Sequence, residues 1–79
     1  MNNIELEQRI KKTMSVIFDT DIESINEQSS PETLEKWDSL GHMNLVVALE
    51  EEFNLQLTEE QMLQIMDYKM IVELLTKIV

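Results

Sequence analysis

The side chains of this 79-residue chain that could do chemistry gather around Ser39. Asp38 comes directly before this serine, and His42 is the single histidine. A hydrolytic triad would need the aspartate behind the histidine and an oxyanion hole, and the G-x-S-x-G elbow is absent. We therefore expect no catalytic residue, and we expect His42 to lie on the core side of a helix, hydrogen-bonded to a loop.

Thiol and metal chemistry have equally little support. The chain contains no cysteine, which excludes thiol catalysis and cysteine zinc clusters. Asp19, Asp21 and Glu23 begin like a calcium-binding loop. That loop would need glycine where Ser24 lies and glutamate where Ser30 lies, so we expect no metal site.

Ser39 is predicted to lie in the first turn of a helix, where a serine is most often a cap. Asp38 can already provide that cap, which would leave the serine hydroxyl free to project outward. A phosphate ester on this oxygen would lie near unpaired N–H groups and the positive end of the helix dipole, an interaction worth on the order of 0.3–1 kcal/mol. A capping role and an attachment role both remain open on this argument.

The apolar pattern predicts an all-α fold, a small four-helix bundle formed by one domain over residues 1–79. An amphipathic stripe predicts a first helix over 4–18, and the polar stretch over 19–37 reads as a long loop. The second helix is expected to begin at Asp38 or Ser39 and to end at Phe53. The residues expected to hold the loop are Ile22, Ile25, Leu34 and Trp37, with a short helical turn at Ser30-Pro31.

A capping-box pattern from Thr58 to Gln61 predicts a short third helix over 59–66, and Asp67 is expected to cap the last helix. The predicted core stripes are Leu6, Ile10, Thr13, Met14 and Ile17 in the first helix and Met70, Ile71, Leu74, Leu75 and Ile78 in the last. Met62, Met66 and Met70 recur at spacing four, and we expect them in the core, with an adaptable peptide-binding surface as the alternative.

The second helix has two apolar faces. Taking 100° per residue from Leu40, one face spans about 140–240° and is wide enough to contact the core. It contains Leu45, Val46, Leu49 and Phe53. Leu40, Met43 and Val47 lie on the opposite side, where they form either an exposed strip bordered by carboxylates or a cluster sheltered by the long loop.

The charge of the chain limits the kinds of partner that it can bind, and further features of the sequence predict its location and the packing of the loop. The net charge is −10, and residues 19–67 carry 13 acidic side chains against Lys36 alone, so we expect no nucleic acid or membrane insertion and expect basic protein patches as partners. No stretch resembles a secretory signal or a bilayer span, so we expect a cytoplasmic monomer. Gly41 predicts close approach of the loop or of a partner, and Trp37 is expected to anchor the loop, contact with a partner being the alternative.

The segment Asp38-Ser39-Leu40, followed by the helix that ends in Glu50-Glu51-Glu52-Phe53, resembles the acyl carrier protein family. The D-S-L attachment site, the acidic helix end, the chain length, the long loop and the short third helix all fit. The resemblance implies a non-catalytic phosphoprotein. A phosphopantetheinyl transferase would attach 4′-phosphopantetheine from coenzyme A to Ser39, with Asp38 capping the helix and serving transferase recognition.

The thiol of this arm would then hold acyl groups as thioesters for acyl-loading and acyl-transfer enzymes. The family's partner-docking surface maps onto Leu40, Met43, Asn44, Val47, Glu50 and Glu51, and its acyl pocket onto Leu45, Val46, Leu49 and Phe53. Gly41 and Asn44 depart from the acidic residues usual in fatty acid biosynthesis, which suggests a specialised lipid, polysaccharide or secondary-metabolite pathway. The rival hypothesis is an unmodified helical adaptor that binds a partner through Leu40, Met43 and Val47.

Overall fold

The computed structural model describes residues 2–79, and within this range the chain is helical without any strand. Its elements are α1 (Asn3–Ile17), the short 3-10 helix η1 (Ile22–Ser24), α2 (Ser39–Phe53), α3 (Glu59–Gln64) and α4 (Tyr68–Ile78). The predicted all-α class, the long loop and the short third helix are confirmed. The third helix ends two residues earlier than predicted, and η1 was not predicted.

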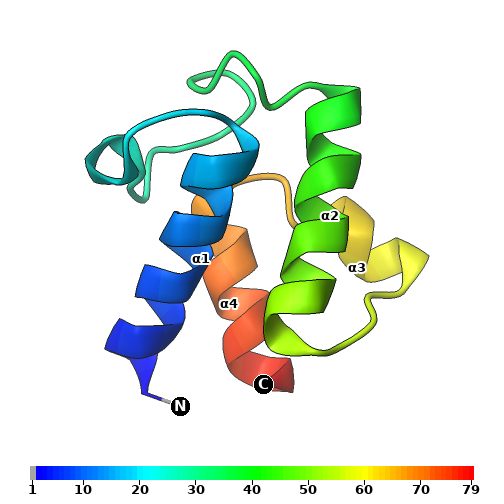
Figure 1. Cartoon of the computed structure of the whole chain (residues 1–79). Coiled ribbons are helices and arrows are strands. Elements are labelled where there is room, and N and C mark those ends of the chain that lie inside the picture. Colours follow the sequence, from blue (N-terminus) through cyan, green and yellow to red (C-terminus); the bar gives the residue numbers. More distant parts are fainter. Residues whose placement is uncertain (1) are drawn as a thin grey trace.

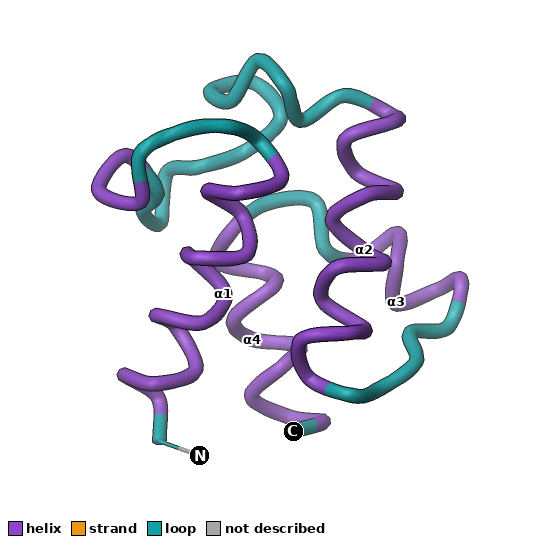
Figure 2. Tube along the Cα trace, viewed as in Figure 1, coloured by secondary structure: helices purple, strands orange, loops and turns teal. Residues whose placement is uncertain are grey.

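The helices pack as a small bundle in which α1 and α2 lie side by side and run in opposite directions (Figure 1). The last helix, α4, lies behind them and contacts α1, while α3 lies on the outer side of α2 and contacts α4. The long connection from α1 to α2 folds over the end of the bundle at which α2 begins (Figure 2). The start of α2 is therefore the point where loop and bundle meet.

Each α-helix begins with a polar side chain that accepts a hydrogen bond from a backbone N–H of the first turn, which is how exposed helix starts are usually stabilised. The caps are Asn2, Asp38, Thr58 and Asp67. The predicted capping box is complete, because Thr58 Oγ1 accepts from the Gln61 N–H at 3.1 Å and Gln61 Oε1 accepts from the Thr58 N–H at 2.9 Å. The helix α2 ends at Asn54, whose left-handed backbone (φ 52°) terminates it.

The core joins α1, α2, α4 and the loops, and α3 contributes the partly buried Met62. Its buried apolar side chains are Leu6, Ile10, Met14, Phe18, Ile25, Trp37, Leu45, Val46, Leu49, Leu57, Ile65, Tyr68, Ile71 and Leu75. The predicted stripe of α4 is too wide, since Met70 and Ile78 are both 40% exposed. The elements packed on α4 are chiefly α1 and the six-residue α3, which leave the edges of that stripe uncovered.

The loop is held at three points predicted from the sequence, because Ile25 and Trp37 are buried and Leu34 packs against the core. The prediction for Ile22 is wrong, since this side chain is 43% exposed at the start of η1. The predicted short helical turn at Ser30 is present as a single turn, at whose start Ser30 Oγ accepts from the Glu32 N–H at 3.2 Å. There the carbonyl of Ser30 accepts from the N–H groups of Thr33 and Leu34 at 3.0 and 2.9 Å.

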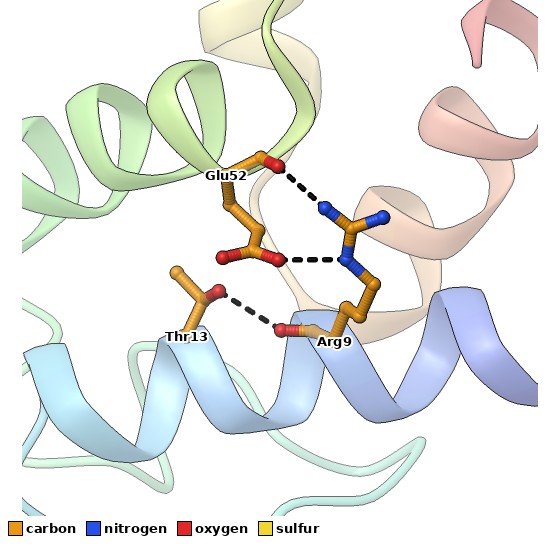
Figure 3. A network of polar contacts seen from close by, with 3 residues as sticks. All are labelled: Arg9, Thr13 and Glu52. Atoms are coloured by element: carbon orange, nitrogen blue, oxygen red, sulfur yellow. Dashed lines mark hydrogen bonds and ion pairs between the residues drawn. The ribbon is translucent and has the colours of Figure 1, made fainter.

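A polar link fixes α1 against the end of α2 (Figure 3). The Arg9 Nε–H donates to Glu52 Oε2 and Nη2 donates to the Glu52 carbonyl, each at 2.6 Å. The same guanidinium lies 4.6 Å from the centre of the Phe53 ring. Arg9 thus supplies positive charge at the C-terminal end of α2, a helix with no basic residue in its last turn.

Candidate functional site

The first turn of α2 presents Ser39 to solvent. Asp38 Oδ1 accepts from the Gly41 N–H at 2.7 Å, so Asp38 caps the helix as predicted. Ser39 is exposed, and its hydroxyl makes no hydrogen bond with any residue of the range 2–79. The capping interpretation of this serine is therefore wrong, because the preceding aspartate already fills that role, and the oxygen is open to modification.

Gly41 explains how the loop reaches this turn. The residue is buried, and a Cβ built on it would overlap the carbonyl oxygen of Lys36. The backbone of the loop therefore occupies the space that any larger side chain would need. Of the two predicted reasons for this glycine, the structure shows the loop.

Trp37 is the last residue of the loop before the cap, and it anchors the loop to the bundle. Only 2% of this residue is exposed, and its ring stacks on Phe18 with the ring centres 5.1 Å apart. The indole Nε1–H donates to His42 Nδ1 at 3.0 Å. The predicted anchoring role is confirmed, and it joins the end of α1 to the beginning of α2.

His42 connects the loop to α3. Its Nε2 lies 2.9 Å from the carbonyl oxygen of Met62, while Nδ1 faces the Trp37 indole. Both ring nitrogens are therefore engaged, and neither is hydrogen-bonded to Ser39. The core-side position predicted for His42 is confirmed, because the ring is half-buried and has a hydrogen-bonding partner on each side. No hydrogen bond joins the ring to Ser39, as a catalytic triad would require.

A groove of about 510 Å³ lies beside Ser39. The residues that line it are Pro31, Trp37, Asp38, Ser39, His42, Met43, Leu63 and Met66. Leu63 is 74% exposed and Met66 is 49% exposed. Because Met70 is also 40% exposed, the prediction that the methionines fill the core is wrong for Met66 and Met70. The short α3 brings Leu63 to this surface, and Met66 reaches it just after that helix ends. Spacing along the sequence alone did not indicate that either residue lies near the serine.

The apolar strip on the outer face of α2 is exposed, and the alternative in which the loop shelters it is wrong. Leu40, Met43 and Val47 are 71%, 52% and 50% exposed. Asn44 and Glu51 are also exposed. Glu50 differs from the expectation for the docking surface, because it is half-buried and its Oε2 accepts from the Leu57 N–H at 2.8 Å. That carboxylate holds the connection to α3.

The four residues assigned to an acyl pocket face the interior. Leu45, Val46 and Leu49 are at most 1% exposed, and Phe53 is half-buried beneath Arg9. None of the four lines the groove beside Ser39. Their apolar environment is confirmed, and a role in holding an acyl chain stays a prediction.

Across residues 2–79, no three or more acidic or histidine side chains are grouped so that they could hold a metal ion. No helix in that part of the chain has the length and apolar character needed to cross a membrane. Neither protein-family models nor curated proteins match the sequence. The candidate site therefore rests on its own geometry: an unpaired exposed hydroxyl, a capped helix start and an adjoining apolar groove.

Proposed function

We propose that this protein is an acyl carrier that bears 4′-phosphopantetheine on Ser39. The observation that carries the proposal is the unpaired, exposed hydroxyl of Ser39 on a helix start that Asp38 caps. The likeness of the D-S-L segment and of the acidic helix behind it to acyl carrier proteins supports the same assignment. The protein itself would catalyse nothing and would serve as the substrate of a phosphopantetheinyl transferase.

The first turn of α2 suits a phosphodiester for an electrostatic reason. The backbone N–H groups of Ser39 and Leu40 have no acceptor within residues 2–79, because the cap bond is made to Gly41. Unpaired N–H groups and the positive end of the helix dipole favour an anion at this position. The arm would supply the thiol that the chain lacks, and the apolar groove at Met43, Leu63 and Met66 would border its path.

The outer face of α2 would receive the partner enzymes. Leu40, Met43 and Val47 form an exposed apolar strip one helix face wide, and Glu51 adds negative charge beside it. Such a strip fits a groove with a basic rim, as in other helix-in-groove contacts. The absence of acidic side chains at Gly41 and Asn44 favours a dedicated set of partners over those of fatty acid biosynthesis.

Intact-mass spectrometry tests the attachment. The chain is incubated with coenzyme A, Mg²⁺ and a transferase of broad specificity, and the wild type is expected to gain the mass of one phosphopantetheine. Ser39→Ala should gain none. Ser24→Ala is the matched control, because Ser24 is also exposed, and it should be modified like the wild type. An unmodified wild type with several transferases would contradict the proposal.

The same exposed strip supports a second candidate, an unmodified helical adaptor. Under that hypothesis the wild type stays unmodified, while Val47→Glu weakens binding of its partner because it places a charge in the apolar strip. A carrier with Val47→Glu would also bind its acyl-transfer enzymes more weakly, but it would still be modified on Ser39. The mass measurement therefore separates the two candidates.

A further inference from the structure

The imidazole of His42 joins two segments that are otherwise separate: the end of the loop at Trp37 and the end of α3 at Met62. The indole N–H can only donate a hydrogen bond, so His42 Nδ1 must accept at this 3.0 Å contact. The Met62 carbonyl can only accept, so Nε2 must carry the hydrogen at the 2.9 Å contact. The two partners together fix the uncharged ring with its hydrogen on Nε2.

A proton added to this ring must go to Nδ1, the one nitrogen with a free electron pair. The new N–H would then face the indole N–H, and two donors cannot share a hydrogen bond. The contact with the Met62 carbonyl survives, because Nε2 remains a donor. Protonation therefore releases the loop side of the joint and keeps the α3 side.

We propose that His42 is a proton-operated latch: the uncharged ring holds the Trp37 end of the loop against α2 by a hydrogen bond, and the protonated ring releases it. The ring also lines the groove beside Ser39, so opening the latch changes the wall of that groove and gives it a positive charge. Trp37 has only 2% exposure and no other side-chain hydrogen bond, so its N–H would be left without a partner. The latch does not depend on modification of Ser39.

Two charged side chains belong to the segments next to the ring. The acidic one, Asp38, lines the same groove as His42. Lys36 lies on the loop, but its ammonium is directed to Asp19 at 3.3 Å. The element α1 contributes the uncharged Phe18 behind the indole.

On the side of α3 the contacts are equally free of positive charge. The ring meets the Met62 carbonyl, and the groove wall continues with the uncharged Leu63 and Met66. The acidic residues of this helix, Glu59 and Glu60, are exposed at its start. Within residues 2–79, the contacts described for the ring are the Trp37 indole and the Met62 carbonyl, and neither is a cation.

The chain offers a clean measurement, because it has one tryptophan and one histidine. A nuclear magnetic resonance titration of the unmodified full chain from about pH 8 to about pH 5 follows the indole N–H and the imidazole ring carbons together, within the range where histidine changes charge. We expect both signals to move along one curve and the exchange of the indole N–H with water to become faster as the ring takes up its proton. In His42→Gln, which cannot be protonated, the indole signal should stay constant over the same range.

Two results would overturn the latch. One is a ring that titrates while the indole signal and its exchange rate stay constant. The other is a ring that takes up no proton above about pH 5. The wild-type comparison of the two signals holds even where His42→Gln fails to fold. Because the sample carries no arm, failure of the latch leaves the proposal for Ser39 untouched, and the reverse also holds.

Discussion

At Gly41 the backbone of the loop lies directly against α2. A substitution with alanine there has two opposing effects on stability, a gain in helix propensity and a clash with the loop. Alanine is about 1 kcal/mol better than glycine in a helix interior. At this position, however, the added Cβ would overlap the Lys36 carbonyl, a backbone atom that cannot rotate away. We expect Gly41→Ala to lower the free energy of unfolding by about 1–3 kcal/mol, the usual cost of overpacking, as measured by urea denaturation.

The matched control is Asn44→Ala, one helical turn further along α2 at an exposed position. It gains helix propensity without a clash, so its stability should equal or slightly exceed that of the wild type. A Gly41→Ala protein as stable as Asn44→Ala would show that the loop yields freely and would refute the packing argument.

At the scale of single residues, the sequence predicted what depends on immediate neighbours. Asp38 next to Ser39 was sufficient to predict that Asp38 can cap the helix, because capping acts over three residues, while the role of the Ser39 hydroxyl stayed open. Gly41 could be predicted to permit close approach, but whether loop or partner approaches depends on where the whole loop runs. The second bond of His42 could not be predicted, since Met62 is 20 residues away and no pattern links them.

The helices α2 and α4 have no acidic residue in their first turns, so the capping aspartate is the acidic group at each of these helix starts, and for α2 it is Asp38. Removal of the Asp38 side chain leaves the Gly41 N–H without its acceptor. We expect Asp38→Ala to lower the free energy of unfolding by about 0.5–2 kcal/mol, and Asp38→Asn to retain most of the stability, because asparagine caps nearly as well. Denaturation of the three proteins under one buffer condition gives the comparison.

Asp21 provides the control for this prediction. It precedes η1 in the same way that Asp38 precedes α2, but its side chain makes no cap bond. Asp21→Ala should therefore change stability by no more than about 0.5 kcal/mol, the usual range for surface substitutions. Equal losses for the two alanine variants would indicate a general effect of charge rather than a cap.

At the scale of elements, periodicity predicted which helices exist and failed on which faces are covered. A stripe of apolar residues shows only that one side of a helix is less polar than the other. Met70 and Ile78 belong to such a stripe and remain 40% exposed, because the short α3 does not extend over them. The exposed strip of α2 was predictable for the opposite reason, since one small bundle cannot bury two faces of the same helix.

Across the whole molecule, side-chain contacts between residues far apart in the sequence hold the helices together, and no local pattern could predict them. The hydroxyl of Tyr68 at the start of α4 donates to Glu7 Oε1 on α1 at 2.9 Å, across 61 residues of sequence. Arg9 and Glu52 are 43 residues apart. Tyr68 was absent from the predicted core although it is 1% exposed and lies on the same face of α4 as Ile71 and Leu75, three and seven residues further on.

The buried tyrosine predicts how stability responds to alkaline pH. Burial, and then the hydrogen bond to the Glu7 carboxylate, raise the pKa of the Tyr68 phenol above its ordinary value of about 10. In the unfolded chain the phenol therefore loses its proton first, which stabilises that state, so the free energy of unfolding should fall as pH rises above about 10. The slope for one proton approaches about 1.4 kcal/mol per pH unit.

Tyr68→Phe isolates this contribution from the lysines, which titrate in the same range in both proteins. The variant loses the bond to Glu7 and should be less stable by about 0.5–1.5 kcal/mol at pH 8. Above about pH 10 its stability should decline less steeply than that of the wild type, because it has no phenol to ionise. Urea denaturation from about pH 8 to about pH 11 measures both slopes, and the absorbance of the single tyrosine reports phenolate directly. Parallel slopes would mean that the phenol ionises as easily in the folded chain as in the unfolded one, which would contradict the raised pKa of Tyr68.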